Sequence, residues 1–256
     1  MEWCYCQKVS KLMHRFFVNP SQIDGKKILI QGEDFHHLTH VLRVDFGEKF
    51  EICDGQGMDY LCEIDHIDKE MLTCKVMLKE ESKGEDGPLI TLYQGLPKGT
   101  KMDEIIQKGV EVGISSFVPY LAHRSVTKID GKVEKKIGRW EKIAYGAAKQ
   151  AKRGMIPSVE VPINLKALVE SIKEYDVFLV AYENENEQTL RLALDGIKAK
   201  GTRLNIGILI GPEGGLTLEE IEALKGNGGK IIGLGHRILR TETAALVLAA
   251  GLNFLL

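Results

Sequence analysis

The stretches Ile210-Gly-Pro-Glu-Gly-Gly-Leu216 and Leu234-Gly-His-Arg-Ile-Leu-Arg-Thr-Glu-Thr243 decide the fold prediction for this chain of 256 residues. Each follows a short apolar run, residues 204–210 in the first case and 230–234 in the second, and each leads into a helix-like segment. An apolar run, a glycine turn and a helix form one unit of an open α/β sheet. Because such sheets hold ligands at the carboxyl ends of their strands, both turns are predicted to lie at a ligand site.

The first turn is predicted to recognise a ligand through its backbone. Glycine lets main-chain N–H and C=O groups approach a ligand closely and adopts positive φ without penalty. Thr217 and Glu220 have the spacing of a capping box, so a helix is predicted to begin directly after Leu216. Taken alone, the turn is equally well explained as a tight strand-to-helix connection.

The second turn favours a functional site, because it carries dense polar chemistry between an apolar strand and an apolar helix predicted over residues 244–256. Its polar residues are Arg237, Arg240, Thr241, Glu242 and Thr243. Neither turn has the G-x-x-x-x-G-K-[ST] pattern of a phosphate loop, or G-x-G-x-x-G followed by an acidic residue. The pattern therefore disfavours a nucleoside triphosphate or a dinucleotide as ligand.

At these residues the sequence resembles a known family. Gly211-Pro-Glu-Gly-Gly215 and Leu239-Arg-Thr-Glu-Thr-Ala244 are similar to the paired C-terminal motifs of the SPOUT methyltransferases, and specifically of the RsmE family, which methylates N3 of a uridine in 16S ribosomal RNA. Further matches occur in the same order over residues 13–256: Met13-His-Arg-Phe-Phe-Val18, His37-Leu-Thr-His-Val-Leu-Arg43, Lys101-Met-Asp103, Gln107-Lys-Gly-Val-Glu-Val-Gly113, Arg139-Trp140, Gln150, Arg153 and Pro157.

The organisation of the chain agrees with two domains. Residues 16–79 contain short β-like runs at 26–30, 49–53, 60–67 and 72–78, one short helix near 33–41, and a glycine turn at Asp54–Gly57, which favours a small barrel or sandwich. A charged, glycine-containing stretch at residues 80–88 marks a boundary. Beyond it, strand and helix patterns alternate, which indicates a mainly parallel sheet.

The resemblance gives these domains their expected identity: an α/β fold with a SPOUT trefoil-knot methyltransferase domain at residues 88–256, preceded by a small PUA-like β-barrel that binds RNA at residues 13–82. Residues 1–12 are expected to be an N-terminal extension or to precede the true start at Met13. The knot enters through the resemblance alone, since the general rules of chain topology predict an unknotted sheet. The resemblance also implies a homodimer whose active site uses both subunits.

S-adenosyl-L-methionine is the methyl donor that the resemblance implies, held mainly by backbone groups of the two turns and of one strand end. The expected donor-binding residues are Val180, Ala181, Gly211, Glu213, Gly214, Gly215, Leu234, Gly235, Ile238, Leu239 and Thr243. Methylation of N3 removes a proton and spreads negative charge onto the uracil oxygens, which a guanidinium stabilises by charge-assisted hydrogen bonds. Arg240 is the first candidate for that role; its alternative is a structural arginine bonded to loop carbonyls.

Glu213 and Glu242 are candidate bases, and the residues alone do not identify which one acts. Glu213 is taken as the catalytic candidate, whereas Glu242 has the position of a carboxylate that stabilises a helix N-terminus.

Ribosomal RNA and the small ribosomal subunit are the expected partners. The net charge of −2 argues against a protein that coats nucleic acid non-specifically, yet eight Lys and Arg residues against two Glu lie between Lys132 and Arg153. A solvated helix face explains this equally well. The candidate RNA contacts are Arg15, Arg43, Lys101, Arg124, Arg139, Lys149 and Arg153.

No metal is expected in the site. The five cysteines include no C-x-x-C pair, and His36, His37 and His40 lack the glutamate of the H-E-x-x-H pattern, so an RNA-facing or packing role is preferred for these histidines. No apolar run approaches the ~18 residues of a membrane span, and the N-terminus lacks the pattern of a secretory signal. The cytoplasm is therefore the expected location, with no membrane partner.

Two other functions are also compatible with the sequence. One is a SPOUT methyltransferase with another target, such as a ribose 2′-hydroxyl; the other is a non-catalytic RNA-binding protein. The intact glycine and Leu239–Thr243 motifs argue against a non-catalytic protein, and the His14-Arg-Phe-Phe17 start of the barrel resembles the uridine N3 family in particular.

Overall fold

The computed structural model describes residues 15–125 and 133–256, which form two compact units. The first unit extends to Glu85 and includes the distant segment Lys152–Met155; the second comprises the described residues of Asp86–Ala151 and Ile156–Leu256. The expected N-terminal extension, residues 1–12, lies outside the described residues. None of the described helices combines the length and apolar character that a membrane span needs.

The first unit is a curled six-stranded sheet in the order β1-β4-β5-β6-β3-β2. The β1–β4 pair is parallel and the other pairs are antiparallel. Its strands are β1 (Arg15–Phe17), β2 (Ile23–Asp24), β3 (Lys27–Gln31), β4 (Lys49–Cys53), β5 (Met58–Ile67) and β6 (Met71–Glu81). Alternate residues of β3 and β4 point inward, and Ile28, Ile30, Phe50 and Ile52 lie in one buried apolar core. The predicted β-runs and the glycine turn between β4 and β5 are confirmed; the short β1 and β2 were not predicted.

The predicted short helix of this unit consists of α1 (Gly32–His36) and a π-helical turn over His37–Leu42. A further short turn is the 3₁₀ helix Pro20–Gln22. The ring of His36, at the end of α1, stacks on that of His40 in the π-helical turn, with centroids 4.3 Å apart. The two imidazoles contact each other, and the Thr39 hydroxyl lies 2.9 Å from His40 Nδ1.

The segment Lys152–Met155 joins the first unit because its backbone fits there closely. Gly154 accepts a hydrogen bond from the Gly57 N–H at 2.9 Å, and Met155 forms an isolated β-bridge with Gln56. A Cβ on Gly154 would lie 2.1 Å from Cβ of Ser82, so only glycine fits at this position. The charged stretch at residues 80–88, which predicted a boundary, does not signal the return of this segment to the first unit.

The second unit is a six-stranded parallel sheet in the order β12-β10-β11-β7-β8-β9. Its strands are β7 (Leu89–Gly95), β8 (Ile114–Tyr120), β9 (Ser158–Val159), β10 (Val177–Ala181), β11 (Asn205–Ile210) and β12 (Lys230–Ile232). The chain leaves the central β7 toward β8 and β9, crosses to β10, and then places β11 between β10 and β7. The carboxyl ends of β10, β11 and β12 consequently share one edge.

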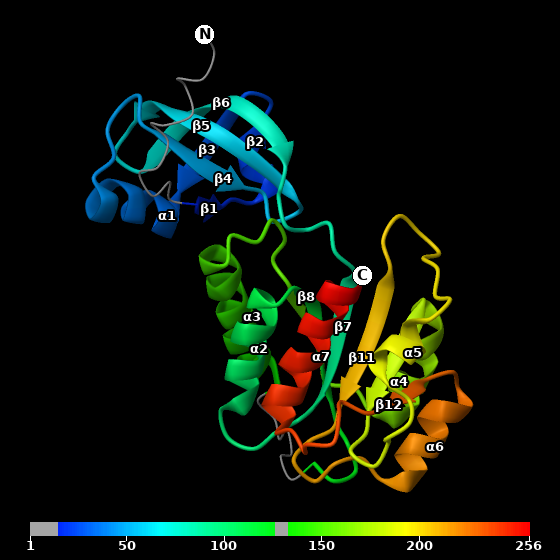
Figure 1. The fold of residues 1–256 in the computed structure, drawn as a ribbon. Coiled ribbons are helices and arrows are strands. Elements are labelled where there is room, and N and C mark those ends of the chain that lie inside the picture. The colour runs from blue at the N-terminus through cyan, green and yellow to red at the C-terminus, as the bar shows by residue number, and fades with distance from the viewer. Residues whose placement is uncertain (1–14, 126–132) are drawn as a thin grey trace. The chain divides into compact units, whose positions relative to one another are not determined.

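Helices cover both faces of the parallel sheet (Figure 1). They are α2 (Lys101–Glu111), α3 (Val133–Gln150), α4 (Leu165–Ser171), α5 (Leu190–Leu194), α6 (Leu218–Gly226) and α7 (Thr241–Leu255), with a 3₁₀ turn at Ile172–Glu174. α2 contacts both α3 and α7 on one side, and α4 and α6 pack on the other. The alternation of strands and helices predicted beyond the boundary is confirmed; β9, two residues long, was missed.

Candidate active site

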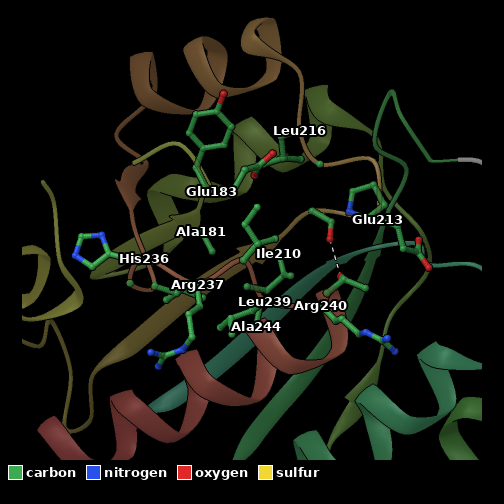
Figure 2. Close-up of a pocket in the computed structure, with 18 of the residues that line it drawn as sticks. Ala181, Glu183, Ile210, Glu213, Leu216, His236, Arg237, Leu239, Arg240 and Ala244 are labelled. Atoms are coloured by element: carbon green, nitrogen blue, oxygen red, sulfur yellow. Dashed lines mark hydrogen bonds between the residues drawn. The ribbon is translucent and has the colours of Figure 1, made fainter. Parts of the chain in front are cut away.

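A cavity of about 470 Å³ lies at the carboxyl edge of the parallel sheet. Most of its lining belongs to the chain segments that follow β10, β11 and β12, as predicted for the two glycine turns, and Lys101 of α2 also contributes. The lining residues are Lys101, Ala181, Tyr182, Glu183, Asn186, Ile210, Gly211, Pro212, Glu213, Gly215, Leu216, Leu234, Gly235, His236, Arg237, Ile238, Leu239, Arg240, Thr241 and Ala244. Figure 2 shows the apolar side chains Ala181, Ile210, Leu239 and Ala244 together at its centre. The cavity therefore combines apolar walls with a polar rim.

The first turn is held by the capping box predicted from the sequence. Thr217 caps α6, and its side chain and that of Glu220 exchange hydrogen bonds with each other's backbone N–H. The buried Glu220 carboxylate also accepts hydrogen bonds from the Tyr120 hydroxyl at 2.6 Å and from the His123 N–H at 3.0 Å. The end of β8 and the residues after it thus hold the first glycine turn through Glu220.

Gly215 has a backbone conformation that other residues rarely adopt, with φ of 69°. A Cβ there would lie 2.8 Å from Oε1 of Glu183. Next to it, Gly214 lies against Arg124, whose guanidinium donates to the carbonyls of Gly214 at 3.1 Å and Leu216 at 3.4 Å. The conformation of the glycine turn is therefore set both by its own sequence and by contacts from the segment after β8.

A single hydroxyl joins the two turns. Thr241, at the start of α7, donates a hydrogen bond to the Gly211 carbonyl at 2.6 Å and accepts one from Gln94 Nε2 at 2.8 Å. Gln94 is fully buried at the end of β7. The second turn itself relies on Gly235, whose φ is 97°. These bonds hold the two turns at a fixed spacing across the cavity.

An ion pair occupies one side of the cavity. Lys101 Nζ donates to Glu213 Oε1 at 2.9 Å and lies 3.6 Å from Glu242 Oε2, while the Lys98 N–H also donates to Glu213. The hydrogen bond to Glu213 raises the pKa of Lys101. Partial burial acts to raise the pKa of Glu213, but the hydrogen bonds from Lys101 and from backbone N–H groups outweigh it, so this pKa is lowered. A carboxylate with a lowered pKa is a weak base.

Arg240, by contrast, is free to act on a ligand. It is the N-cap residue of α7, it is exposed, and among the described residues no group accepts a hydrogen bond from its guanidinium. In Figure 2 its side chain extends outward from the start of α7. The alternative of an arginine bonded to loop carbonyls describes Arg124, and not Arg240.

Two families of RNA methyltransferase domains match this chain. A family described as "RNA methyltransferase domain" matches residues 85–253, and one described as "RNA methyltransferase PUA domain" matches residues 30–77. "Ribosomal RNA small subunit methyltransferase E" of Bacillus subtilis (strain 168) is 37% identical over 249 residues, covering 94% of this chain and 96% of that protein. The chain belongs to the RsmE family of RNA methyltransferases.

Solved structures agree with this assignment. Ribosomal RNA small subunit methyltransferase E from Neisseria gonorrhoeae, bound to S-adenosyl methionine, has a TM-score of 0.81 at 26% identity, covering 95% of this chain and 98% of that one. A putative methyltransferase from Legionella pneumophila in complex with the same cofactor has a TM-score of 0.79 at 28% identity, with coverage of 95% and 98%. The SPOUT knotted methyltransferase fold and the PUA-like domain, expected from the resemblance, are confirmed.

Most of the predicted donor-binding residues of this RsmE-family chain line the cavity. Those that do are Ala181, Gly211, Glu213, Gly215, Leu234, Gly235, Ile238 and Leu239, together with the catalytic candidate Arg240. Three do not: Val180 is buried in the core behind the cavity, Gly214 lies against Arg124, and Thr243 is exposed on α7.

The sequence prediction missed the cavity residues Glu183 and Asn186, and it placed His236, Arg237 and Thr241 in the second turn without including them among the donor-binding residues. Glu183 and Asn186 lie in an irregular segment after β10, where no motif marks them. Thr241 lies inside the recognised Leu239–Thr243 motif, and its position directly before the apolar helix was the available signal.

The candidate RNA contacts fall into two groups. Arg15 and Arg153 are buried: the Arg15 guanidinium pairs with Asp59 at 2.6 Å, and that of Arg153 pairs with Glu85 at 2.7 Å. Buried, paired guanidinium groups hold the first unit together and are not presented to a phosphate. Arg43, Lys101, Arg124, Arg139 and Lys149 are at least partly exposed, although Lys101 and Arg124 hold site groups and Arg139 pairs with Asp103.

Within the described residues, no three His, Cys, Asp or Glu side chains lie together as metal ligands would. Cys53, Cys62 and Cys74 are buried free thiols in the first unit. Burial raises the pKa of Cys62 to about 12, which makes this thiol a poor metal ligand because ligation requires the thiolate.

Proposed function

We propose that this protein methylates N3 of a specific uridine in the 16S RNA of the small ribosomal subunit, with S-adenosyl-L-methionine as methyl donor. The observation that carries the proposal is the backbone-walled cavity between the two glycine turns, with the Arg240 guanidinium at its rim and without a partner among the described residues. The membership of the RsmE family and the relatives' names agree with this target. Since the subunit's RNA is in the cytoplasm, the protein is proposed to act there.

The cavity fits a donor of this kind. Its volume of about 470 Å³ lies within the usual range of small-molecule sites, roughly 300–1,000 Å³. Apolar side chains such as Ile210 and Leu239 suit a flat base, and the bare backbone at Gly211 and Gly235 suits its polar edges. The space that a Cβ on Gly215 would fill leaves room for the Glu183 carboxylate at the cavity wall. Residues 181, 211, 215, 234, 235 and 239 would hold the donor.

When bound, the donor supplies an electrophilic methyl group, and the chain's own residues prepare the acceptor nitrogen. Removal of the N3 proton places negative charge on the uracil oxygens. Arg240 is proposed to donate hydrogen bonds to that charge, since its guanidinium has no described partner to compete. Glu213 is proposed to fix Lys101 beside the acceptor and is a weak base there, because its pKa is lowered. The N3 proton is proposed to pass to solvent or to the carboxylate of Glu213 or Glu242.

RNA is proposed to contact the exposed basic residues Arg43, Arg139 and Lys149, with Lys101 and Arg124 near the site.

We further propose a homodimer, as the family resemblance implies. The support is an exposed apolar face of α7, on which Val247 and Phe254, seven residues apart, are 45% and 90% exposed. Light scattering of the parent and of Phe254→Glu tests this: the parent is expected to be dimeric and the variant to shift to monomer.

Reconstitution of the reaction tests the function. Small subunits from a strain that lacks the enzyme would be incubated with purified protein and S-adenosyl-L-methionine, and the modified uridine mapped by mass spectrometry. We expect one 3-methyluridine in 16S RNA, with or without a chelator. Methylation of a ribose 2′-hydroxyl, or no transfer while the donor is bound, contradicts the proposal.

A further inference from the structure

The charges that line the cavity are not balanced in pairs. Its acidic residues are Glu183 and Glu213, and its basic residues are Lys101, Arg237 and Arg240. Glu213 is neutralised by Lys101 at 2.9 Å. Glu183 has no hydrogen bond or ion pair with any described residue, so within the described part of the chain it is the unpaired carboxylate of the cavity wall.

The position of Glu183 is set by the glycine turn. It follows β10, where the chain has just passed Ala181 and Tyr182. Its Oε1 lies where the absence of a side chain on Gly215 leaves room, 2.8 Å from the position that a Cβ would occupy. Figure 2 shows the carboxylate beside Leu216, whereas the Arg237 guanidinium points away from it. The carboxylate therefore faces the cavity and is not compensated by the arginines of the second turn.

We propose that Glu183 recognises the positive charge of the donor's sulfonium and thereby makes the site prefer the methyl donor over its demethylated product. This inference rests on the proposed function. When the methyl group leaves with its bond to the deprotonated N3, the sulfonium keeps the C–S electron pair and becomes a neutral thioether. The product S-adenosylhomocysteine therefore lacks the positive charge of the donor. A carboxylate without a partner among the described residues attracts that charge and so binds the donor more tightly than the product.

The expected effect is modest because Glu183 is exposed. Solvent-exposed charge pairs contribute up to ~1 kcal/mol, which corresponds to about fivefold in affinity. Glu183→Gln keeps the shape and the hydrogen-bonding oxygen and removes only the charge. Glu187→Gln is the matched control, since Glu187 is an exposed glutamate of the same segment and does not line the cavity. Its replacement changes the net charge of the protein by the same amount as Glu183→Gln.

Isothermal titration of the full-length parent and both variants with S-adenosyl-L-methionine and with S-adenosylhomocysteine tests the inference. In Glu183→Gln we expect about fivefold weaker binding of the donor and a change of less than about twofold for the product. Glu187→Gln should bind both as the parent does. The donor's affinity for the parent should fall as salt rises, and this dependence should be reduced in Glu183→Gln.

Each other result overturns the inference. Equal weakening of donor and product would place Glu183 on a group that both share, such as a ribose hydroxyl or the ammonium. Unchanged donor affinity would remove it from recognition altogether. If the parent binds neither compound, the proposed function itself fails, and that outcome is distinct from failure of the role given to Glu183.

Discussion

Replacement of Gly215 by alanine tests whether the conformation of the first turn makes the site. Gly215 has φ of 69°, and an alanine held in this left-handed conformation by the turn destabilises the fold by about 1–2 kcal/mol. The new Cβ would also lie 2.8 Å from Glu183 Oε1. Because that oxygen ends a flexible side chain, it moves at little energetic cost, but it leaves its place in the cavity wall.

Two measurable effects follow. Free energy of unfolding should fall by about 1–2 kcal/mol, which lowers Tm by about 2 to 8 °C for a unit of this size. Affinity for S-adenosyl-L-methionine should fall by at least the factor expected for Glu183→Gln, since the carboxylate is displaced and the turn backbone shifts. Denaturant unfolding and calorimetric titration of the same preparations measure both.

Gly146→Ala is the control. Gly146 lies within α3, where an added Cβ meets nothing within 4 Å, so alanine should raise the stability by about 0.5–1 kcal/mol and leave donor binding unchanged. The reasoning is refuted if Gly215→Ala unfolds at the same denaturant concentration as the parent and binds the donor equally well. A loss of stability in both variants would instead show general intolerance of substitution.

Three further outcomes are expected. Arg240→Lys should bind the donor as the parent does but transfer the methyl group at least about 30-fold more slowly in single turnovers, the lower limit for loss of one donor worth ~2–4 kcal/mol; a rate equal to the parent's would give Arg240 a structural role. The Lys101–Glu213 pair should stabilise the protein at pH values above the ordinary glutamate pKa of 4.5, and this stabilisation should be lost as the pH falls through the lowered pKa of Glu213. The difference in free energy of unfolding between the parent and Glu213→Gln should therefore be larger at pH 7 than at pH 3.5. Arg153→Ala should lose about 3–5 kcal/mol of stability, because Glu85 is left buried without its partner. Arg43→Ala should keep the stability of the parent and weaken RNA binding in filter assays. The reverse pattern would contradict a structural role for the buried Arg153 and an RNA-binding role for the exposed Arg43.

Local sequence determined what could be predicted of the fold and the site. The signals that predicted the site are short-range, and each determines the backbone conformation of only a few residues. They are the capping box of Thr217 and Glu220, the apolar run before Gly211 and the glycines of both turns. Strand-to-helix units place their turns at one edge of a parallel sheet, which is why two turns far apart in sequence were expected at one site. The knot was expected only through the family resemblance.

What could not be predicted depends on contacts between distant residues. Arg15 and Arg153 carry the same side chain as Arg43, and the sequence does not reveal that Asp59 and Glu85 neutralise the first two. The return of Lys152–Met155 to the first unit depends on Gly154 fitting against Ser82, 72 positions away in the numbering. Glu183 belongs to no motif, and its place in the cavity wall follows from the turn that Gly215 makes.

A site built from backbone needs its turns held at a fixed spacing, and Thr241 shows how this chain does so. Its hydroxyl has one hydrogen, which it donates to the Gly211 carbonyl, so toward Gln94 it acts as the acceptor, and this fixes which end of the Gln94 amide faces it. The Nε2 group then also donates to the Gly95 carbonyl, and Oε1 is left buried without a described partner. Valine at position 241 preserves the shape of threonine but removes the donor to the Gly211 carbonyl and the acceptor of one of the two Gln94 Nε2 hydrogen bonds. Because a buried polar group that loses its partner is costly, this substitution should be destabilising. The one hydroxyl therefore couples β7, the first turn and the start of α7, and the spacing of the two turns depends on all three.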